Sequence, residues 1–284
     1  MKKKISAALF VSLLAATRVN AADPTVESVS ASIDMMWVMF RAVLVFLMHA
    51  GFAMVETGFT RSKNSLNILM KNMLTVAVSS VLYFVVGFAL MFGSSKGGFI
   101  GSSGFFLNGE SDQMSFFVFQ IVFAATCATI ISGALAERMK LSSYMMLTIA
   151  MVAVIYPVAG HWVWGEGWLS KLGFVDFAGS TVVHLTGALG AAVAVTFLGA
   201  RLGKYGSDGK VNAIQGHNIP LGALGVFILW FGFNGGSTLA ADPALVPGII
   251  ATTLMSGSCG VLSSALYTKF RYKRIDASLT LNGA

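Results

Sequence analysis

Seven long apolar stretches dominate the sequence, and each is long enough to cross a lipid bilayer. A crossing helix needs about 20 predominantly apolar residues. The stretches lie near 34–58, 72–93, 114–135, 142–164, 179–201, 218–240 and 245–269. Only 11% of the 284 residues are charged, whereas soluble domains carry roughly 25%. Because lipid cannot satisfy exposed backbone groups, each stretch must be helical. The sequence therefore predicts an all-α polytopic membrane protein.

The first 21 residues are typical of a cleavable secretory signal peptide. Lysines at positions 2–4 precede an apolar run over 5–16, and Ala21 ends an acceptable cleavage site. That run is too short to span a membrane, although an uncleaved first helix is the alternative interpretation. Residues 22–284 are then expected to form a single transmembrane domain.

Positive residues are concentrated in the loops on one side of the predicted membrane. The loops after the first, third, fifth and seventh stretches hold most lysines and arginines, including Lys71 and the cluster at 269–274. The opposite loops hold only Lys96 and Lys171. Positive residues favour the cytoplasmic side. We therefore expect a plasma (inner) membrane protein with its mature N-terminus outside and residues 269–274 in the cytoplasm.

Asp176 and His184 bracket the start of the fifth apolar stretch, among small residues such as Gly179, Gly187 and Gly190. Ionisable side chains inside a membrane are costly and usually face the bundle interior or a polar path. Small residues allow neighbouring helices to approach closely. The pattern favours the lining of a polar pathway. A helix-capping aspartate and a core histidine are the alternative that the spacing leaves open.

Aromatic residues gather toward the predicted outer ends of three stretches. They are Phe119 and Phe123 in the third stretch, Trp164 at the end of the fourth, and Phe233, close to Ser237, in the sixth. An aromatic face attracts a small cation by about 0.5–2 kcal/mol, increasingly as the cation desolvates. Anchoring at the membrane interface, or plain core packing, is the alternative reading of these side chains.

Other functional classes find little support in the sequence. Metalloprotease, P-loop and acyl-transfer motifs are absent, so an enzyme is not expected. The basic residues lie in short loops rather than in one patch, which argues against a nucleic-acid partner. A retinal protein would need a lysine in the middle of the seventh stretch, and 244–268 contains none. We expect neither a cofactor nor a metal.

Four segments together resemble the ammonium transporter family (Amt/Mep/Rh). They are Gly51–Asn64 (GFAMVETGFTRSKN), Gly133–Arg138 (GALAER), Asp176–His184 (DFAGSTVVH) and Trp230–Ser237 (WFGFNGGS). They follow the family's order and spacing over essentially the whole mature chain. The resemblance implies a helical channel for ammonium or ammonia, in contact with membrane lipid, that normally forms homotrimers with one pore per subunit.

The resemblance also implies roles for individual residues in an outer substrate site. Trp164, Ser237 and Phe119 would recruit ammonium, with Trp164 supplying an aromatic face and Ser237 a hydrogen-bond acceptor. Asp176 would organise this site and favour the cation electrostatically.

A gate and a pore histidine would follow the outer site. Phe123 and Phe233 would be the stacked gate, and His184 would line the pore. An imidazole can accept and donate protons near neutral pH, so His184 is expected to bond the dehydrated substrate and take part in its deprotonation. Hydrated ions would be rejected by the apolar passage.

The sequence departs from the family pattern in its length. Family members usually have eleven spans in two inverted five-helix repeats, whereas here the second repeat stops after two helices. The end at 274–284 is expected to be the start of an eighth span or a terminal stub, and a second pore histidine has no counterpart. The alternative to transport is a non-conducting ammonium sensor or regulatory partner subunit in a mixed trimer. A cytosolic regulatory protein is a candidate partner.

Overall fold

The computed structural model describes residues 25–109, 111–212, 214–229 and 233–284, so the expected signal peptide at 1–21 lies outside the described part. Within the described residues, seven helical segments are long and apolar enough to cross a membrane. They are Val26–Gly58, Ser62–Phe92, Met114–Leu135, Leu141–Lys171, Ser180–Leu198, Ile219–Gly236 and Val246–Tyr272. Each overlaps one predicted stretch, and the predicted all-α fold is confirmed.

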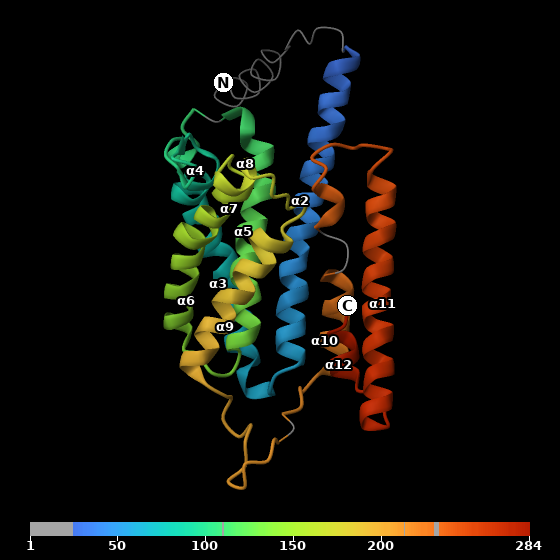
Figure 1. The fold of residues 1–284 in the computed structure, drawn as a ribbon. Helices are drawn as coiled ribbons and strands as arrows, with labels where there is room; N and C mark the ends of the chain where they lie inside the picture. The colour runs from blue at the N-terminus through green and yellow to red at the C-terminus, as the bar shows by residue number, and fades with distance from the viewer. Residues whose placement is uncertain (1–24, 110, 213, 230–232) are drawn as a thin grey trace, which may run out of the picture.

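The first crossing segment is one long helix, α2 (Val26–Gly58), which projects beyond the rest of the bundle at its N-terminal end (Figure 1). Thr25 caps it, because the threonine side chain accepts a hydrogen bond from the Ser28 N–H at 3.1 Å. The helix begins before the predicted stretch at 34–58, since its first turns are polar and extend past the apolar part. A short turn, η1 (Ser62–Asn64), then leads to the second segment.

The second and fourth segments each contain a π-helical turn in the middle. Their elements are α3 (Ser65–Leu82), η2 (Tyr83–Gly87) and α4 (Phe88–Phe92), and α6 (Leu141–Ala150), η5 (Met151–Ile155), α7 (Tyr156–Val163) and α8 (Trp168–Lys171). Pro157 lacks the N–H that an α-helix would direct at the carbonyl of Ala153 in η5, which accounts for the wider turn there. The two π-turns lie against each other, since a methyl group on Gly87 would be 3.0 Å from the Val152 carbonyl oxygen.

The third segment, α5 (Met114–Leu135), is the central helix of the bundle. Most of its side chains are buried, and it packs against α2, α3 and α9 (Thr186–Leu198). A methyl group on Gly187 would lie 2.8 Å from the Cys127 carbonyl oxygen, so α9 meets α5 almost backbone to backbone. The close approach that the small residues predict is therefore confirmed. The fifth segment begins as η6 (Ser180–Leu185), a third π-turn.

The sixth and seventh segments pack on the opposite side of α2. They contain α10 (Ile219–Leu229), η7 (Asn234–Gly236), α11 (Val246–Tyr272) and α12 (Ala277–Leu281). A methyl group on Gly51 would lie 2.9 Å from the Gly225 carbonyl oxygen, which brings α10 close to α2. Figure 1 shows α11 at the edge of the bundle, and its most apolar stretch is unburied. After α11 the chain turns back, and Asp276 caps the short helix α12.

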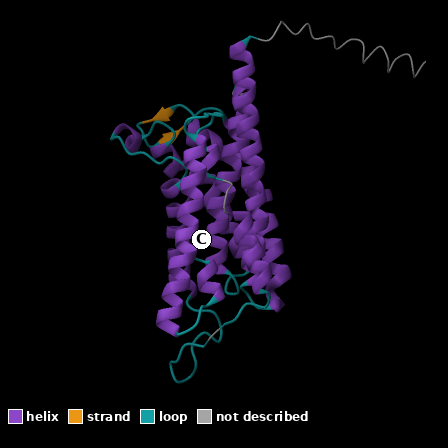
Figure 2. Ribbon diagram, turned by 90° about the vertical axis from the view of Figure 1, so that its right-hand side faces the viewer, coloured by secondary structure: helices purple, strands orange, loops and turns teal. Residues whose placement is uncertain are grey.

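A small cap covers the end of the bundle at which α4 finishes. It contains the hairpin of β1 (Ser95–Lys96) and β2 (Ile100–Gly101), followed by the turns η3 (Phe105–Leu107) and η4 (Ser111–Gln113). Figure 2 shows the hairpin above the helices. His161 holds the cap, with ring nitrogens 2.8 Å from Ser95 Oγ and 2.8 Å from the Met91 carbonyl oxygen.

The expectation that Lys71 lies in a cytoplasmic loop is wrong. It is a buried residue of α3, and its Nζ lies 3.0 Å from Glu56 Oε2 and 2.8 Å from the Ser132 carbonyl oxygen. The ammonium group also lies 5.3 Å from the centre of the Tyr144 ring. A lysine in an apolar bundle needs such compensation. Without Lys71, the loops on the predicted cytoplasmic side still hold more positive residues than the opposite loops.

Candidate functional site

The site is built around the carboxylate of Asp176, which lies in the loop four residues before η6 and is 7% exposed. Its oxygens accept hydrogen bonds from four consecutive backbone N–H groups at 2.7–3.0 Å, namely those of Gly179, Ser180, Thr181 and Val182. An acid at this position satisfies the free N–H groups at a helix start and complements the helix dipole. The helix-capping interpretation of Asp176 is therefore confirmed.

Trp164 lies at the end of α7 and is tied to the same loop. Its indole Nε1 donates a 2.7 Å hydrogen bond to the backbone oxygen of Asp176. Gly179 makes room for this arrangement, because its φ of 101° lies in the left-handed region and a methyl group there would be 3.2 Å from the Trp164 ring. Asp176 thus orders both the start of η6 and, through its backbone, the orientation of the indole.

Four aromatic rings from three crossing segments form one group beside this loop. Phe123 lies at its centre and is 1% exposed. Its ring centre is 4.5 Å from that of Phe119, 4.2 Å from that of Phe233 and 6.2 Å from that of Trp164. The interplanar angles of 47–67° correspond to tilted and edge contacts, which aromatic pairs prefer. We call Phe119, Phe123, Phe233 and Trp164 the aromatic group.

Ser237 follows η7 and belongs to the segment that carries Phe233. Its hydroxyl donates to the Phe233 carbonyl oxygen at 3.2 Å, which leaves lone pairs of the hydroxyl oxygen able to accept a hydrogen bond. The segment is held from both sides. Trp37 Nε1 donates to the Gly235 carbonyl oxygen at 3.0 Å, and Asn234 Nδ2 donates to Thr253 Oγ1 at 2.9 Å. Trp230, part of the same predicted motif, lies outside the described residues.

His184 lies next to the aromatic group, with its ring centre 5.4 Å from that of Phe233. Among the described residues, no hydrogen-bond partner contacts its imidazole. The side chain lines a cavity of about 620 Å³, together with Phe233 and mostly apolar residues of α2 and α10 (Met48, Phe52, Val55, Val226 and Leu229). It also lines a second cavity of about 340 Å³ that reaches Ser180 and Thr252. The imidazole is therefore open to a small ligand.

The C-terminal residues Leu281, Asn282 and Ala284 contribute to the wall of the larger cavity. They come from α12 and the residues after it, which fold back against α10 and α11. In the described residues this segment contains the short helix α12.

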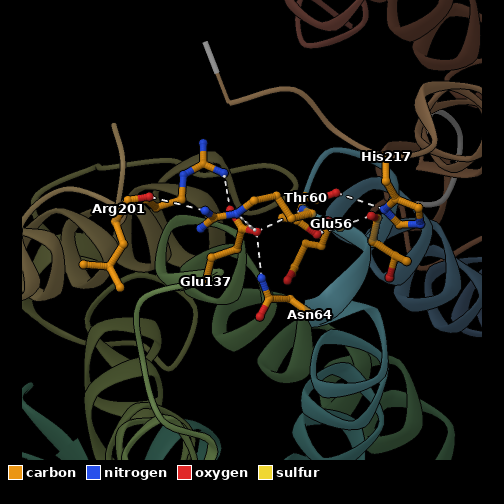
Figure 3. A network of polar contacts seen from close by, with 9 residues as sticks. Glu56, Thr60, Asn64, Glu137, Arg201 and His217 are labelled. Atoms are coloured by element: carbon orange, nitrogen blue, oxygen red, sulfur yellow. Dashed lines mark hydrogen bonds and ion pairs between the residues drawn. The ribbon is translucent and has the colours of Figure 1, made fainter. Parts of the chain in front are cut away.

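A second polar network, at the opposite end of the bundle, was not expected from the sequence, which marked Glu137 only as part of the GALAER segment. The Glu137 carboxylate accepts hydrogen bonds from the Arg61 backbone N–H (2.9 Å), Arg61 Nε (2.9 Å), Asn64 Nδ2 (2.8 Å) and Arg201 (3.1 Å). Figure 3 shows these contacts, together with the 2.9 Å contact of His217 Nδ1 to the Thr60 carbonyl oxygen. The network joins four chain segments that are distant in sequence, so no local sequence pattern predicts their contacts.

The Glu137 carboxylate is fully covered, with 0% of its side chain exposed. Burial alone would raise its pKa. The hydrogen bonds from Arg61, Asn64 and Arg201 outweigh burial and lower the pKa of Glu137 to about 2. The group therefore remains a carboxylate at any physiological pH.

Comparisons with known proteins agree with one another. The model of the Ammonium Transporter Family matches residues 36–284. The chain is 45% identical to ammonium transporter Amt2 of Archaeoglobus fulgidus, over 98% of this chain and 64% of that protein. A solved sensor Amt protein has a TM-score of 0.87 at 43% identity, covering 89% of this chain and 66% of the other. Mep2 of Saccharomyces cerevisiae has a TM-score of 0.79 at 30% identity, covering 88% and 58%.

The chain thus spans about two thirds or less of the lengths of these relatives. The family match nevertheless extends over nearly all of the described residues, and the relative from Archaeoglobus fulgidus is named a transporter, not an enzyme. The chain belongs to the ammonium transporter family.

Proposed function

We propose that this chain carries ammonium or ammonia across the membrane through the aromatic group and past His184. The observation that carries the proposal is the contact between Phe233 and His184, at 5.4 Å between ring centres, with both residues lining the 620 Å³ cavity. A substrate that passes the rings meets an imidazole without a hydrogen-bond partner among the described residues. Together, these residues provide the successive steps of the proposed path, which are recruitment, dehydration and proton exchange.

Recruitment takes place at Trp164, Phe119 and Ser237. The indole face attracts the cation, and the Ser237 hydroxyl oxygen accepts one of its N–H groups. Each ammonium–aromatic contact contributes about 0.5–2 kcal/mol, increasing as water is removed. Asp176 acts through the loop that it orders and through its negative charge, because its oxygens are already occupied by backbone N–H groups.

Dehydration takes place at Phe123 and Phe233. Their rings offer no oxygen to replace the hydration shell of a sodium or potassium ion, so such ions are rejected. Past the rings, an ammonium N–H bonds the free nitrogen of His184. Transfer of that proton gives neutral ammonia and an imidazolium, and His184 must release the proton again before the next cycle.

The proposed assembly is a homotrimer in the plasma membrane, with the N-terminus outside and residues 269–274 in the cytoplasm. The loop charges support this orientation, and the exposed apolar face of α11 suits lipid or a neighbouring subunit. Native mass spectrometry in detergent measures the number of subunits. A cytosolic regulatory protein is the proposed further partner.

Ammonium-evoked currents in proteoliposomes test the transport proposal. Wild-type protein is expected to give a saturable current with ammonium and none with potassium, and His184→Ala is expected to abolish or derange it. His217→Ala is the matched control, since His217 lies in the Glu137 end of the bundle. An unchanged pH-coupled ammonium current in His184→Ala would remove His184 from the mechanism.

A second candidate function is ammonium sensing without conduction. The solved protein at a TM-score of 0.87 is named a sensor, which is the specific observation in its favour. Ammonium binding to purified protein in the absence of any current would support sensing over transport.

A further inference from the structure

Arg41 is a buried cation beside the outer substrate site. It lies on α2 and is 7% exposed, although arginine is among the residues least often buried. The expectation for an arginine at this depth is a side chain that extends to water. Here the guanidinium packs on Trp37, with its carbon Cζ 4.1 Å from the ring centre, and its Nε is buried.

The other face of Arg41 meets the segment between Phe233 and Ser237. A methyl group on Gly235 would lie 2.7 Å from the guanidinium carbon. A methyl group on Gly236 would lie 2.7 Å from Arg41 Cβ and 2.9 Å from Cε2 of Phe119. One glycine therefore separates the arginine side chain from a ring of the aromatic group, and the guanidinium lies between Trp37 and Gly235.

No counter-charge contacts Arg41 in the part of the chain that the structure describes. Its Nε is buried without a hydrogen-bond partner, and the ion pairs of the described residues do not include it. Three acids of the described residues accept hydrogen bonds from backbone N–H groups. Asp34 accepts from the Ala241 N–H, Asp242 from the Ala244 N–H, and Asp176 from its own loop. The guanidinium is thus not paired with a carboxylate among the described residues.

We propose that Arg41 is an affinity-determining residue of the outer site, and that its fixed positive charge weakens ammonium binding there. This inference rests on the proposed function of Trp164, Phe119 and Ser237. Buried charges are screened much less than exposed ones, so the repulsion acts through the protein interior. Repulsion at the outer site raises the concentration for half-maximal flux, while passage beyond Phe123 and Phe233 is unaffected. Arg41 therefore shifts the working range of the protein to higher ammonium concentrations.

Arg41→Met and Arg41→Gln test this inference against Arg41→Lys, which keeps the charge. Lys171→Met is the matched control, because it removes an exposed charge from α8, on the same side as Trp164. Ammonium-evoked currents in proteoliposomes give the KM and the maximal current, and titration calorimetry on the same proteins gives the Kd. Both neutral variants are expected to lower KM and Kd roughly three- to tenfold, with little change in the maximal current. Arg41→Lys and Lys171→Met are expected to stay within about twofold of wild type.

The outcomes separate this inference from the transport proposal. Unchanged or higher Kd values in both neutral variants would overturn the role of Arg41, as would an equal effect of Lys171→Met. A wild-type protein that binds ammonium but gives no current would contradict transport, while the Kd comparison would still decide the role of Arg41. A wild-type protein and neutral variants that bind no ammonium would overturn both. Size-exclusion profiles identify any variant that fails to fold. The two neutral variants differ in shape and polarity, so an effect that both share is due to the lost charge.

Discussion

His184 and Phe233 lie ring against ring, 5.4 Å between centres, although they belong to the fifth and sixth crossing segments. Phe233 therefore lies in ring contact with both Phe123, at 4.2 Å between centres, and His184. It is the only described side chain placed in ring contact with each of them. The two sides of the proposed path, the aromatic group and the cavity, meet at this one phenylalanine.

Phe233→Ala is expected to weaken ion selectivity. Removing the ring opens the passage between Phe123 and the cavity and admits water, which reduces the dehydration barrier. The measurement is potassium current relative to ammonium current in proteoliposomes. Phe197→Ala is the control, because Phe197 is 87% exposed on α9. Undiminished exclusion of potassium by Phe233→Ala would argue against a gate at this position.

Trp164→Leu is expected to weaken apparent ammonium affinity more than it lowers maximal flux. Leucine fills part of the volume but removes the aromatic face, worth about 0.5–2 kcal/mol, which corresponds to roughly 2- to 30-fold in KM. Trp168→Leu, at a tryptophan that is 37% exposed outside the aromatic group, serves as the comparison. A large fall in maximal flux at unchanged KM would count against recruitment by Trp164.

Asp176→Asn is expected to lower both stability and transport. One carboxylate oxygen would become an NH2 group, which cannot accept hydrogen bonds from the backbone N–H groups that it faces. About two buried donors would then be left unpaired, at a cost of roughly 1–3 kcal/mol each. Thermal unfolding in detergent and ammonium current are measured on the same preparation. Asp208→Asn, at an exposed acid in the loop before α10, should leave both quantities near wild type. A wild-type melting temperature for Asp176→Asn would contradict the capping role.

The Glu56–Lys71 pair is expected to show strong coupling in a double-mutant cycle. Glu56→Gln or Lys71→Met alone leaves a charge inside the bundle and should cost about 3–5 kcal/mol of unfolding free energy. The double variant removes both charges and should cost less than the two single variants added together. Chemical unfolding in detergent micelles measures each term. Additive losses would mean that the two charges do not stabilise each other.

Stability is expected to fall in acid because of Glu137. Its pKa is about 2 in the folded protein, below the ordinary value of 4.5. A lowered folded pKa contributes stability that is present above pH 4.5 and is lost as the pH falls toward 2. Arg61 and Arg201 are 33% and 27% exposed, so solvent screening limits the contribution to about 1–2 kcal/mol. Melting curves between pH 6 and pH 3 compare wild type with Glu137→Gln. The acid-induced loss should be smaller in the variant, and equal losses would contradict this assignment.

The apolar stretches by themselves determined the seven crossing helices, because a bilayer accepts only backbone that satisfies its own hydrogen bonds. The third stretch, predicted at 114–135, matches Met114–Leu135 residue for residue. The start of α2 was predicted less well. The helix extends into polar residues, and a cap at Thr25, not hydropathy, sets its first residue. The sequence also indicated Asp176 as a helix cap or a pathway residue, and both readings rest on local features.

Only the tertiary structure decided which side chains meet. Phe119 and Phe123 come from α5, Trp164 from the end of α7 and Phe233 from the sixth segment, and hydropathy cannot say which faces of those helices turn toward one another. The same limit explains why Lys71 was placed wrongly. A lysine next to the start of an apolar stretch suggests a loop, but Glu56 on another helix compensates the burial of this one. Arg41 and Glu137 were equally hidden, because the contacts of a charged side chain depend on neighbours that are distant in sequence. Local composition decides what enters the membrane, and long-range packing decides which polar groups lie together inside it.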